Sequence, residues 1–428
     1  MEWSIYSHLY YSKKAESYLL YSSLSNMIVE LDNDGYNEIV KIKEDPNCID
    51  IKNERYKFLF DSRFIVQSNE IETNKLMLTA LSSRFNTKSL SLTIAPTRAC
   101  NFSCPYCYEE DRANKKMSKE VQDGILDFVK KYDSAKSLHV TWYGGEPTVA
   151  IDVIKYLSGE LEKHFVNYSA FMVTNGFLLD KIIDDIELLK IKRLQITLDG
   201  TKETHDQTRH LINGNGTFDK ILSNIDNLLS KCNNVKISIR MNISKNNSNQ
   251  FVSLNRMLQK RYGNKVNLYP AFVHDYNGSC QAGTCYDNGY TKALFLKKIF
   301  DDDAIYTKDL FPTRAAKGCM SQNLNAFLIG PEGELYKCWH HLGVKEKEVG
   351  SIFEPQIITN YGLLSNAMIK GDPLLDNKCK SCVLFPSCFG GCVDNKNGND
   401  DFCIPAKSML EDFIDTRYTV KTISTSNN

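Results

Sequence analysis

The run Cys100-Asn-Phe-Ser-Cys104-Pro-Tyr-Cys107 follows a β-like segment at residues 90–95 almost directly. Three thiolates on one short loop can hold three irons of a [4Fe–4S] cluster. The fourth iron then has no protein ligand and can bind and activate a small molecule. Zinc is the competing interpretation, because Cys-x2-Cys pairs are common zinc ligands. Structural zinc sites usually take four protein ligands, however, and no histidine lies near this run.

Outward from this loop, strand and helix patterns alternate. β-rich runs are expected at residues 90–95, 138–143, 170–174, 194–198, 235–243 and 266–272, with helices at 119–132, 151–164, 179–189, 218–230 and 250–262. The alternation predicts an α/β fold of consecutive βα units with a parallel sheet. Six units fit a partial (β/α)6 barrel as well as a doubly wound sheet. Both folds bind ligands at the carboxyl ends of the strands, where the three-cysteine loop lies.

The loop, with the aromatic Tyr106 before its last cysteine, resembles the radical SAM superfamily. The run Gly144-Gly145-Glu146-Pro147 ends the second expected strand and is similar to that family's GGEP motif. In the family, this motif contacts the amino group of the SAM methionine, and glycines permit close backbone approach to a ligand. An ordinary strand-to-helix turn is the alternative. The resemblance implies that Cys100, Cys104 and Cys107 hold a [4Fe–4S] cluster that binds S-adenosyl-L-methionine (SAM).

Later strand ends also carry polar side chains. They are Thr174, Asn175, Thr197, Asp199, Arg240 and Asn242. By position these residues resemble those with which related enzymes contact the ribose, carboxylate and adenine of SAM; structural roles are the alternative. His205 belongs to a stretch, residues 199–206, that is similar to one in the peptide-modifying branch, and Arg209 follows it closely. They are candidate catalytic residues lining the cavity, or else ordinary surface side chains.

Seven more cysteines are spread over residues 319–403. They are Cys319, Cys338, Cys379, Cys382, Cys388, Cys392 and Cys403. Their spacing is similar to that of the SPASM domain of radical SAM maturases, and a zinc ribbon is the alternative. The resemblance implies two auxiliary [4Fe–4S] clusters, one held by Cys319, Cys338 and Cys392 and one by Cys379, Cys382, Cys388 and Cys403. The first set lacks a fourth ligand, so either Cys280 or Cys285 supplies it or that iron is open.

Composition excludes several classes of protein. The chain has 428 residues, of which 42% are hydrophobic, and it is expected to fold into two or three domains. Lys+Arg and Asp+Glu each number 52, so the formal net charge is zero. This charge balance does not indicate binding to nucleic acid or to an anionic membrane. We see neither a signal peptide nor a membrane-spanning stretch, so a cytoplasmic protein is expected. In that compartment, cysteine clusters indicate metal rather than disulfides.

We expect three domains: a small α+β module at residues 1–88, the radical SAM core at 89–309, and the SPASM domain and tail at 310–428. Strands at 18–21, 27–31 and 58–66, a turn at 32–35 and a helix near 70–81 are expected in the first domain. A short helix is expected at 407–415. By pattern and position the first module resembles winged-helix-like modules that take a leader peptide onto a sheet edge. The segment at 310–405 has little core of its own and would need metal to fold.

The resemblance implies an enzyme that reductively cleaves SAM and abstracts hydrogen from a ribosomally made precursor peptide, installing a thioether or carbon–carbon cross-link. Sulfatase-maturing relatives carry an Asp directly after the second SPASM cysteine, where this chain has Trp339, followed by His340 and His341. That departure counts against sulfatase maturation, and the run at residues 337–343 looks more like that of maturases of ribosomally made peptides. Maturation of a folded protein, by formylglycine formation or a quinone-type cross-link, is the alternative. A non-catalytic zinc or iron–sulfur scaffold is the alternative of another class. Flavodoxin or ferredoxin is the expected electron donor.

Overall fold

The computed structural model describes residues 1–107, 109, 115–273, 284–286, 288–307, 310, 319–393 and 403–426. The chain divides into two compact units. Unit 1 contains residues 1–84, 287–319 and 369–428, and unit 2 contains residues 85–286 and 320–368. Residues 320–368 therefore group with the core, although the sequence placed them in the third domain. The physical reason is β12 (Ala326–Ile329), which pairs in parallel with β6 (Ser89–Ile94) and extends its sheet.

A nine-stranded sheet forms the centre of unit 2, in the order β11-β10-β9-β8-β7-β6-β12-β13-β14. From β6 to β11 all neighbours are parallel, and their order follows the sequence without reversal. A doubly wound sheet requires a reversal, so this order fits the partial barrel. All six expected strands are confirmed. The remaining bounds are β7 (Ser137–Trp142), β8 (Asn167–Thr174), β9 (Ile191–Thr197), β10 (Lys236–Ile243), β11 (Val266–Phe272), β13 (Glu334–Tyr336) and β14 (Gly350–Ser351).

Helices connect these strands, and four of the five bury an apolar face; the exception is short and polar and buries only His205. They are α4 (Lys119–Lys130), α5 (Ile151–His164), α6 (Lys202–Thr208), α7 (Phe218–Lys231) and α8 (Gln250–Tyr262). The helix expected at 179–189 is wrong: short 3-10 turns lie at Leu179–Lys181 and Ile183–Asp185. The buried apolar residues there do recur at helical spacing. Three of them are isoleucines, whose restricted χ1 lowers helix propensity.

The N-terminal part of unit 1 combines a small antiparallel sheet with three helices. Its strands are β2 (Ser7–Ser12), β3 (Ser17–Ser22) and β4 (Met27–Leu31), and its helices are α1 (Asn33–Glu44), α2 (Glu54–Asp61) and α3 (Asn69–Arg84). A short second pairing joins β1 (Glu2–Trp3) to β5 (Ile65–Val66). The expected α+β module is thus present in outline.

Two local expectations in this module are wrong, and both concern helix caps. The segment expected as a strand at 58–66 begins inside α2, whose start is fixed by Asn53 Oδ1 accepting from Arg55 N at 2.9 Å. The turn expected at 32–35 is the start of α1, where Asp32 Oδ1 accepts from Gly35 N at 2.7 Å. Asn and Asp are favoured at both turns and helix N-caps, which explains the confusion.

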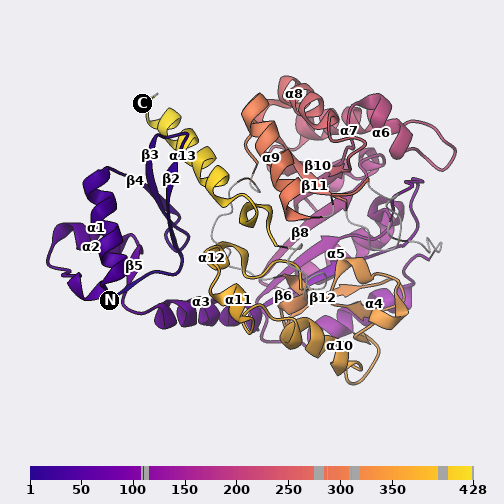
Figure 1. Cartoon of the computed structure of the whole chain (residues 1–428). Coiled ribbons are helices and arrows are strands. Elements are labelled where there is room, and N and C mark those ends of the chain that lie inside the picture. Colours follow the sequence, from indigo (N-terminus) through magenta and orange to yellow (C-terminus); the bar gives the residue numbers. More distant parts are fainter. Residues whose placement is uncertain are drawn as a thin grey trace. The chain divides into compact units, whose positions relative to one another are not determined.

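The C-terminal part of unit 1 contains α9 (Gly289–Asp303), α11 (Asn377–Lys380), α12 (Phe385–Cys388) and α13 (Leu410–Ser426). Helix α13 extends well beyond the expected end at residue 415 and lies beside the small sheet (Figure 1). The Tyr10 hydroxyl donates to Asp415 Oδ1 at 2.6 Å, and Arg417 donates to the Asn26 carbonyl at 3.1 Å. Every helix in the described part of the chain is too short or too polar to cross a membrane.

The cysteine-rich segment of unit 1 shares a hydrophobic core with the N-terminal module. This core contains Tyr6, Leu24, Val66, Leu76, Ala80, Leu374, Phe385 and Phe389, with Cys379 and Cys382 packed against it. The Tyr6 hydroxyl also donates to the Lys380 carbonyl at 2.8 Å. Arg84 Nη1 and Asp372 Oδ2 form an ion pair at 2.7 Å, with side chains only 2% and 8% exposed. The apolar support that the sequence of this segment lacks therefore comes from residues 1–84.

Asp372→Ala should lower the free energy of unfolding by about 3–5 kcal/mol, because it leaves the buried Arg84 cation without its partner. Denaturant unfolding followed by circular dichroism would measure the loss. Asp127→Ala is the control: it removes an exposed pair with Lys130 and should cost less than about 1 kcal/mol. Equal losses in the two variants would contradict the importance of the buried pair.

Candidate active site

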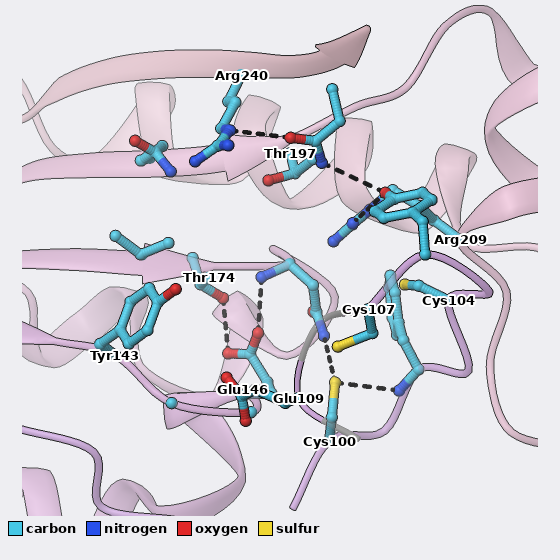
Figure 2. A pocket seen from close by; sticks show the side chains of 18 of the residues that line it. Cys100, Cys104, Cys107, Glu109, Tyr143, Glu146, Thr174, Thr197, Arg209 and Arg240 are labelled. Atoms are coloured by element: carbon cyan, nitrogen blue, oxygen red, sulfur yellow. Dashed lines mark hydrogen bonds between the residues drawn. The ribbon is translucent and has the colours of Figure 1, made fainter. Parts of the chain in front are cut away.

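A cavity of about 240 Å³ lies at the carboxyl ends of the parallel strands of unit 2 (Figure 2). Most residues that the sequence proposed for cofactor binding line it together. They are Cys100, Cys104, Tyr106 and Cys107 after β6, Gly144, Gly145 and Glu146 after β7, Thr174 and Asn175 at the end of β8, Thr197 on β9, Arg209 after α6, and Arg240 and Asn242 on β10. One sheet edge thus collects side chains from residues about 140 positions apart, as the βα topology requires.

The three cysteines lie on one side of this cavity, beneath Arg209 in the view of Figure 2. None of them is in a disulfide. Cys100 Sγ accepts from Phe102 N at 3.4 Å, and burial raises the pKa of this thiol to about 12. A metal ion bound at this sulfur would stabilise the thiolate against that rise. Three soft thiolate donors on one loop fit a [4Fe–4S] cluster. In the described residues, no three His, Cys, Asp or Glu side chains are placed close enough together to hold one metal ion.

The two glycines after β7 pack directly on the segment that precedes the cysteines. Gly145 N donates to the Thr97 carbonyl at 3.2 Å, and Glu146 N donates to the Ala99 carbonyl at 2.9 Å. A Cβ on Gly145 would lie 2.3 Å from the Arg98 carbonyl oxygen, and Gly144 has a φ of 111°. From the sequence, these glycines were expected to let a ligand approach the backbone closely. In the structure, their lack of a side chain is needed for contact with the protein's own backbone.

Glu146 is 1% exposed and joins the loops after β7 and β8. Its Oε1 accepts from Thr148 N at 3.0 Å and Thr174 Oγ1 at 2.7 Å, while Oε2 accepts from Asn175 N at 2.6 Å. Burial raises the pKa of Glu146, and these hydrogen bonds oppose the rise. Pro147 is buried at the start of a 3-10 turn, Pro147–Ala150, and the described cavity lining does not include it.

Asp199 and His205 lie in the protein interior, and the described lining of the cavity includes neither residue. His205 is fully buried; its Nδ1 accepts from Asp199 N at 3.2 Å, and Nε2 lies 3.0 Å from Thr217 Oγ1. Burial lowers the pKa of His205 well below its usual value. Because both ring nitrogens of this neutral imidazole have hydrogen-bond partners, His205 stabilises the turn after β9. A structural role is therefore favoured over a catalytic role for His205. Of the two catalytic candidates, Arg209 alone reaches the cavity.

The cavity also contains aromatic and polar residues that sequence analysis did not assign to it. They include Phe102, Glu109, Tyr143, Gln195, Phe272, Trp339 and His340. The Trp339 ring lies 4.7 Å from that of Tyr143, and Trp339 Nε1 donates to Thr93 Oγ1 at 2.9 Å. Gln195 could have been found, because it precedes Thr197 by two residues on one strand and shares its face. Trp339 comes from a distant segment, so only pairing of β12 with β6 brings it here.

A second cavity, in unit 1, is lined by Cys379, Cys382, Cys388 and Cys403. Four thiols around one cavity are the donor set of a closed [4Fe–4S] site. Lys407 Nζ lies 3.4 Å from Cys403 Sγ, and burial raises the pKa of Cys388.

The other proposed auxiliary set stays a prediction. Cys319 and Cys392 are exposed in unit 1, and Cys338 is half-buried in unit 2. Cys285, a candidate fourth ligand, is 3% exposed and disulfide-bonded, and Cys280 lies outside the described residues.

Comparison with known proteins agrees with this geometry. Residues 94–257 match the family model described as the Radical SAM superfamily. A "Cysteine-type anaerobic sulfatase-maturating enzyme" of Clostridium novyi is 27% identical over 384 residues, which cover 79% of this chain and 99% of that relative.

Two solved structures share the fold over different spans. The structure "Native anSMEcpe with bound AdoMet" has a TM-score of 0.60 at 20% identity and covers 79% of this chain and 100% of its own. Streptococcus suis SuiB bound to precursor peptide SuiA has a TM-score of 0.51 at 15% identity, covering 94% of this chain and 98% of its own. The likeness to SuiB therefore extends over more of the present chain.

Gly145→Ala should prevent the loop from packing and reduce both bound iron and SAM affinity, because its Cβ would overlap backbone oxygens of Arg98 and Ala99. Iron analysis and calorimetric titration with SAM would measure this. Gly159→Ala, in α5, is the matched control, since nothing lies within 4 Å of its Cβ and helix propensity should improve. Normal iron content and SAM affinity in Gly145→Ala would contradict the role given to the glycine.

Proposed function

Residues 94–257 are a radical SAM domain and the chain is an enzyme, and from this premise we propose that it matures a peptide or protein substrate. The substrate we favour is a ribosomally made precursor peptide, in which the enzyme installs a thioether or carbon–carbon cross-link. When bound, a reduced cluster and SAM supply the radical that takes a hydrogen atom from the substrate. The observation that carries the proposal is the cavity that joins three cysteines to the Glu146 network at the strand ends.

The chain's own residues have separate proposed roles around this cavity. Cys100, Cys104 and Cys107 hold the cluster. The backbone around Gly145 and the buried Glu146 receive the amino group of SAM, while the polar residues at the ends of β8, β9 and β10 hold the rest of the cofactor. These last residues are Thr174, Asn175, Thr197, Arg240 and Asn242. Tyr143 and Trp339 line the cavity with rings 4.7 Å apart, and their proposed role is to limit the access of water to the reacting atoms.

Trp339 supports cross-linking over formylglycine formation. Its ring stands in the cavity wall, held by Tyr143 and by the hydrogen bond to Thr93. An indole cannot accept a proton from a substrate thiol or hydroxyl. The likeness in fold over 94% of this chain to SuiB, whose structure contains a precursor peptide, supports a peptide substrate.

The N-terminal module is proposed to bind the leader part of the peptide. Within its three-stranded sheet, β2 and β4 are the outer strands, and each offers one edge for an added strand. Residues 1–88 are therefore assigned to recognition rather than chemistry. The proposed electron donor is flavodoxin or ferredoxin, and the proposed location is cytoplasmic.

Formylglycine formation in a sulfatase is the second candidate, because a named sulfatase-maturating enzyme is 27% identical over 99% of its own length. Mass spectrometry separates the candidates. The anaerobically prepared enzyme, reductant and SAM are incubated either with the peptide encoded beside its gene or with a cysteine-containing sulfatase peptide. Loss of two hydrogen atoms from the first peptide is expected. Replacement of the cysteine sulfur by oxygen together with loss of two hydrogen atoms, which converts CH2–SH into an aldehyde, would favour formylglycine formation in the second peptide. SAM that stays intact with both peptides would contradict the proposal.

We also propose three [4Fe–4S] clusters in all. Replacing Cys100, Cys104 and Cys107 together by Ala should then remove about a third of the bound iron and sulfide and leave the auxiliary clusters in place. Chemical iron and sulfide analysis would measure this. Cys48→Ala and Cys232→Ala are the controls and should change neither content, because both lie outside the proposed ligand sets. A colourless protein with stoichiometric zinc would instead support the non-catalytic scaffold.

A further inference from the structure

Arg209 places a largely buried positive charge in the wall of the active-site cavity (Figure 2). Its side chain is 11% exposed, and Nη1 donates to the Tyr106 hydroxyl at 2.7 Å. The guanidinium carbon also lies 5.6 Å from the centre of the Phe102 ring. Tyr106 stands between Cys104 and Cys107, and Phe102 between Cys100 and Cys104. The charge is therefore attached to the cysteine loop at two points.

Backbone hydrogen bonds fix the segment of Arg209 against the same loop. Ser103 N donates to the His210 carbonyl at 3.0 Å, and Ile212 N donates to the Asn101 carbonyl at 3.2 Å. Residues Phe102 and Leu211 form an antiparallel bridge between them. The position of the guanidinium therefore depends on main-chain contacts as well as on its own side-chain bonds.

Asp199 is the counter-charge of this arrangement. Its carboxylate accepts from the Tyr106 hydroxyl and from Asn242 N, the latter at 3.0 Å, and Oδ2 lies 4.0 Å from Arg209 Nη1. Asn247 Nδ2 donates to the Asp199 carbonyl at 3.1 Å, which fixes the backbone. Burial raises the pKa of Asp199, and the charge of Arg209 opposes that rise. Tyr106 thus links the loop after β6 to the ends of β9 and β10, across two intervening strands.

We propose that Arg209 is the cation that sets the reduction potential at the three-cysteine loop, and that Asp199 is a positioning residue that holds it there through Tyr106. The inference rests on the proposed cluster at Cys100, Cys104 and Cys107. Adding one electron to that cluster adds one negative charge. A fixed cation in a water-poor cavity favours this state, and a nearby anion opposes it. Arg209 therefore raises the potential of the cluster, and Asp199 lowers it.

Charge and geometry make different predictions for different substitutions. Arg209→Gln removes the cation and should shift the potential to a more negative value. Asp199→Asn removes the anion, keeps the shape, and should shift it to a less negative value. Tyr106→Phe removes the hydroxyl that fixes Arg209 and should shift it in the same direction as Arg209→Gln, by less. Arg209→Lys keeps the charge without the planar fork, so it should preserve part of the wild-type potential.

The test is a reductive titration of the full-length protein, followed by electron paramagnetic resonance. The cluster is identified by the change in its signal when SAM is added, and iron content is measured for every variant. Arg193→Gln is the matched control, because Arg193 also lies over a phenylalanine ring, 5.1 Å from Phe171, but is exposed and outside the cavity lining. Its potential should equal that of the unchanged protein.

Shifts of opposite sign in Arg209→Gln and Asp199→Asn, with cluster content retained, would support the inference. Shifts of the same sign, or none, would overturn it. If Arg209→Gln does not assemble a cluster, Asp199→Asn and Arg209→Lys are compared instead. The inference then requires a less negative potential in Asp199→Asn and no such shift in Arg209→Lys. A wild-type protein without any SAM-responsive signal would overturn the proposed function itself, which distinguishes that failure from failure of the electrostatic inference.

Discussion

The close packing of the Gly144-Gly145 run on residues 97–99 is the contact on which the rest of the active site depends. It brings the turn after β7 within hydrogen-bonding distance of the backbone that leads into the cysteines. Glu146 then points inward and gathers donors from the end of β8. Because each step requires the one before it, a single extra methyl group at Gly145 would disturb the cysteines, the Glu146 network and the cavity between them.

From that contact the cavity acquires two different sides. The cysteines and the fixed charge of Arg209 lie on one side and Tyr143 lies on the other (Figure 2). The Trp339 ring packs against Tyr143, 4.7 Å away. Fixed charges and oriented dipoles do not have to reorient during a reaction, so they stabilise the reacting state without a reorganisation cost. A protein can contribute in this way to chemistry that its cofactor performs. Under the proposed function, the aromatic side would offer an apolar surface to a group of the substrate. In unit 1, the N-terminal module supplies the core on which a second cysteine set rests.

Much of this arrangement could be predicted from the sequence, for identifiable reasons. Runs rich in β-branched and apolar residues, bounded by turn residues, mark all six core strands, and the ends of those strands contribute most of the cavity lining. The errors arose where local signals were ambiguous: Asp32 and Asn53 begin helices although they are equally typical of turns. The placement of Trp339 depends on β12 joining β6, a pairing across more than 200 residues that no local pattern reveals. Likewise, the bond between Tyr106 and Asp199 needs three strand ends to meet.

Isotope transfer tests the central claim of a peptide-directed radical SAM enzyme most directly. A short peptide that is encoded next to the gene and modified by the enzyme would be prepared with deuterium on the carbon atoms of the modified residue. After reaction with reductant and SAM, mass spectrometry would compare the 5′-deoxyadenosine released. The account predicts that deuterium moves from the peptide into 5′-deoxyadenosine as the modification forms. Modified peptide accompanied by 5′-deoxyadenosine free of deuterium from every labelled position would contradict it.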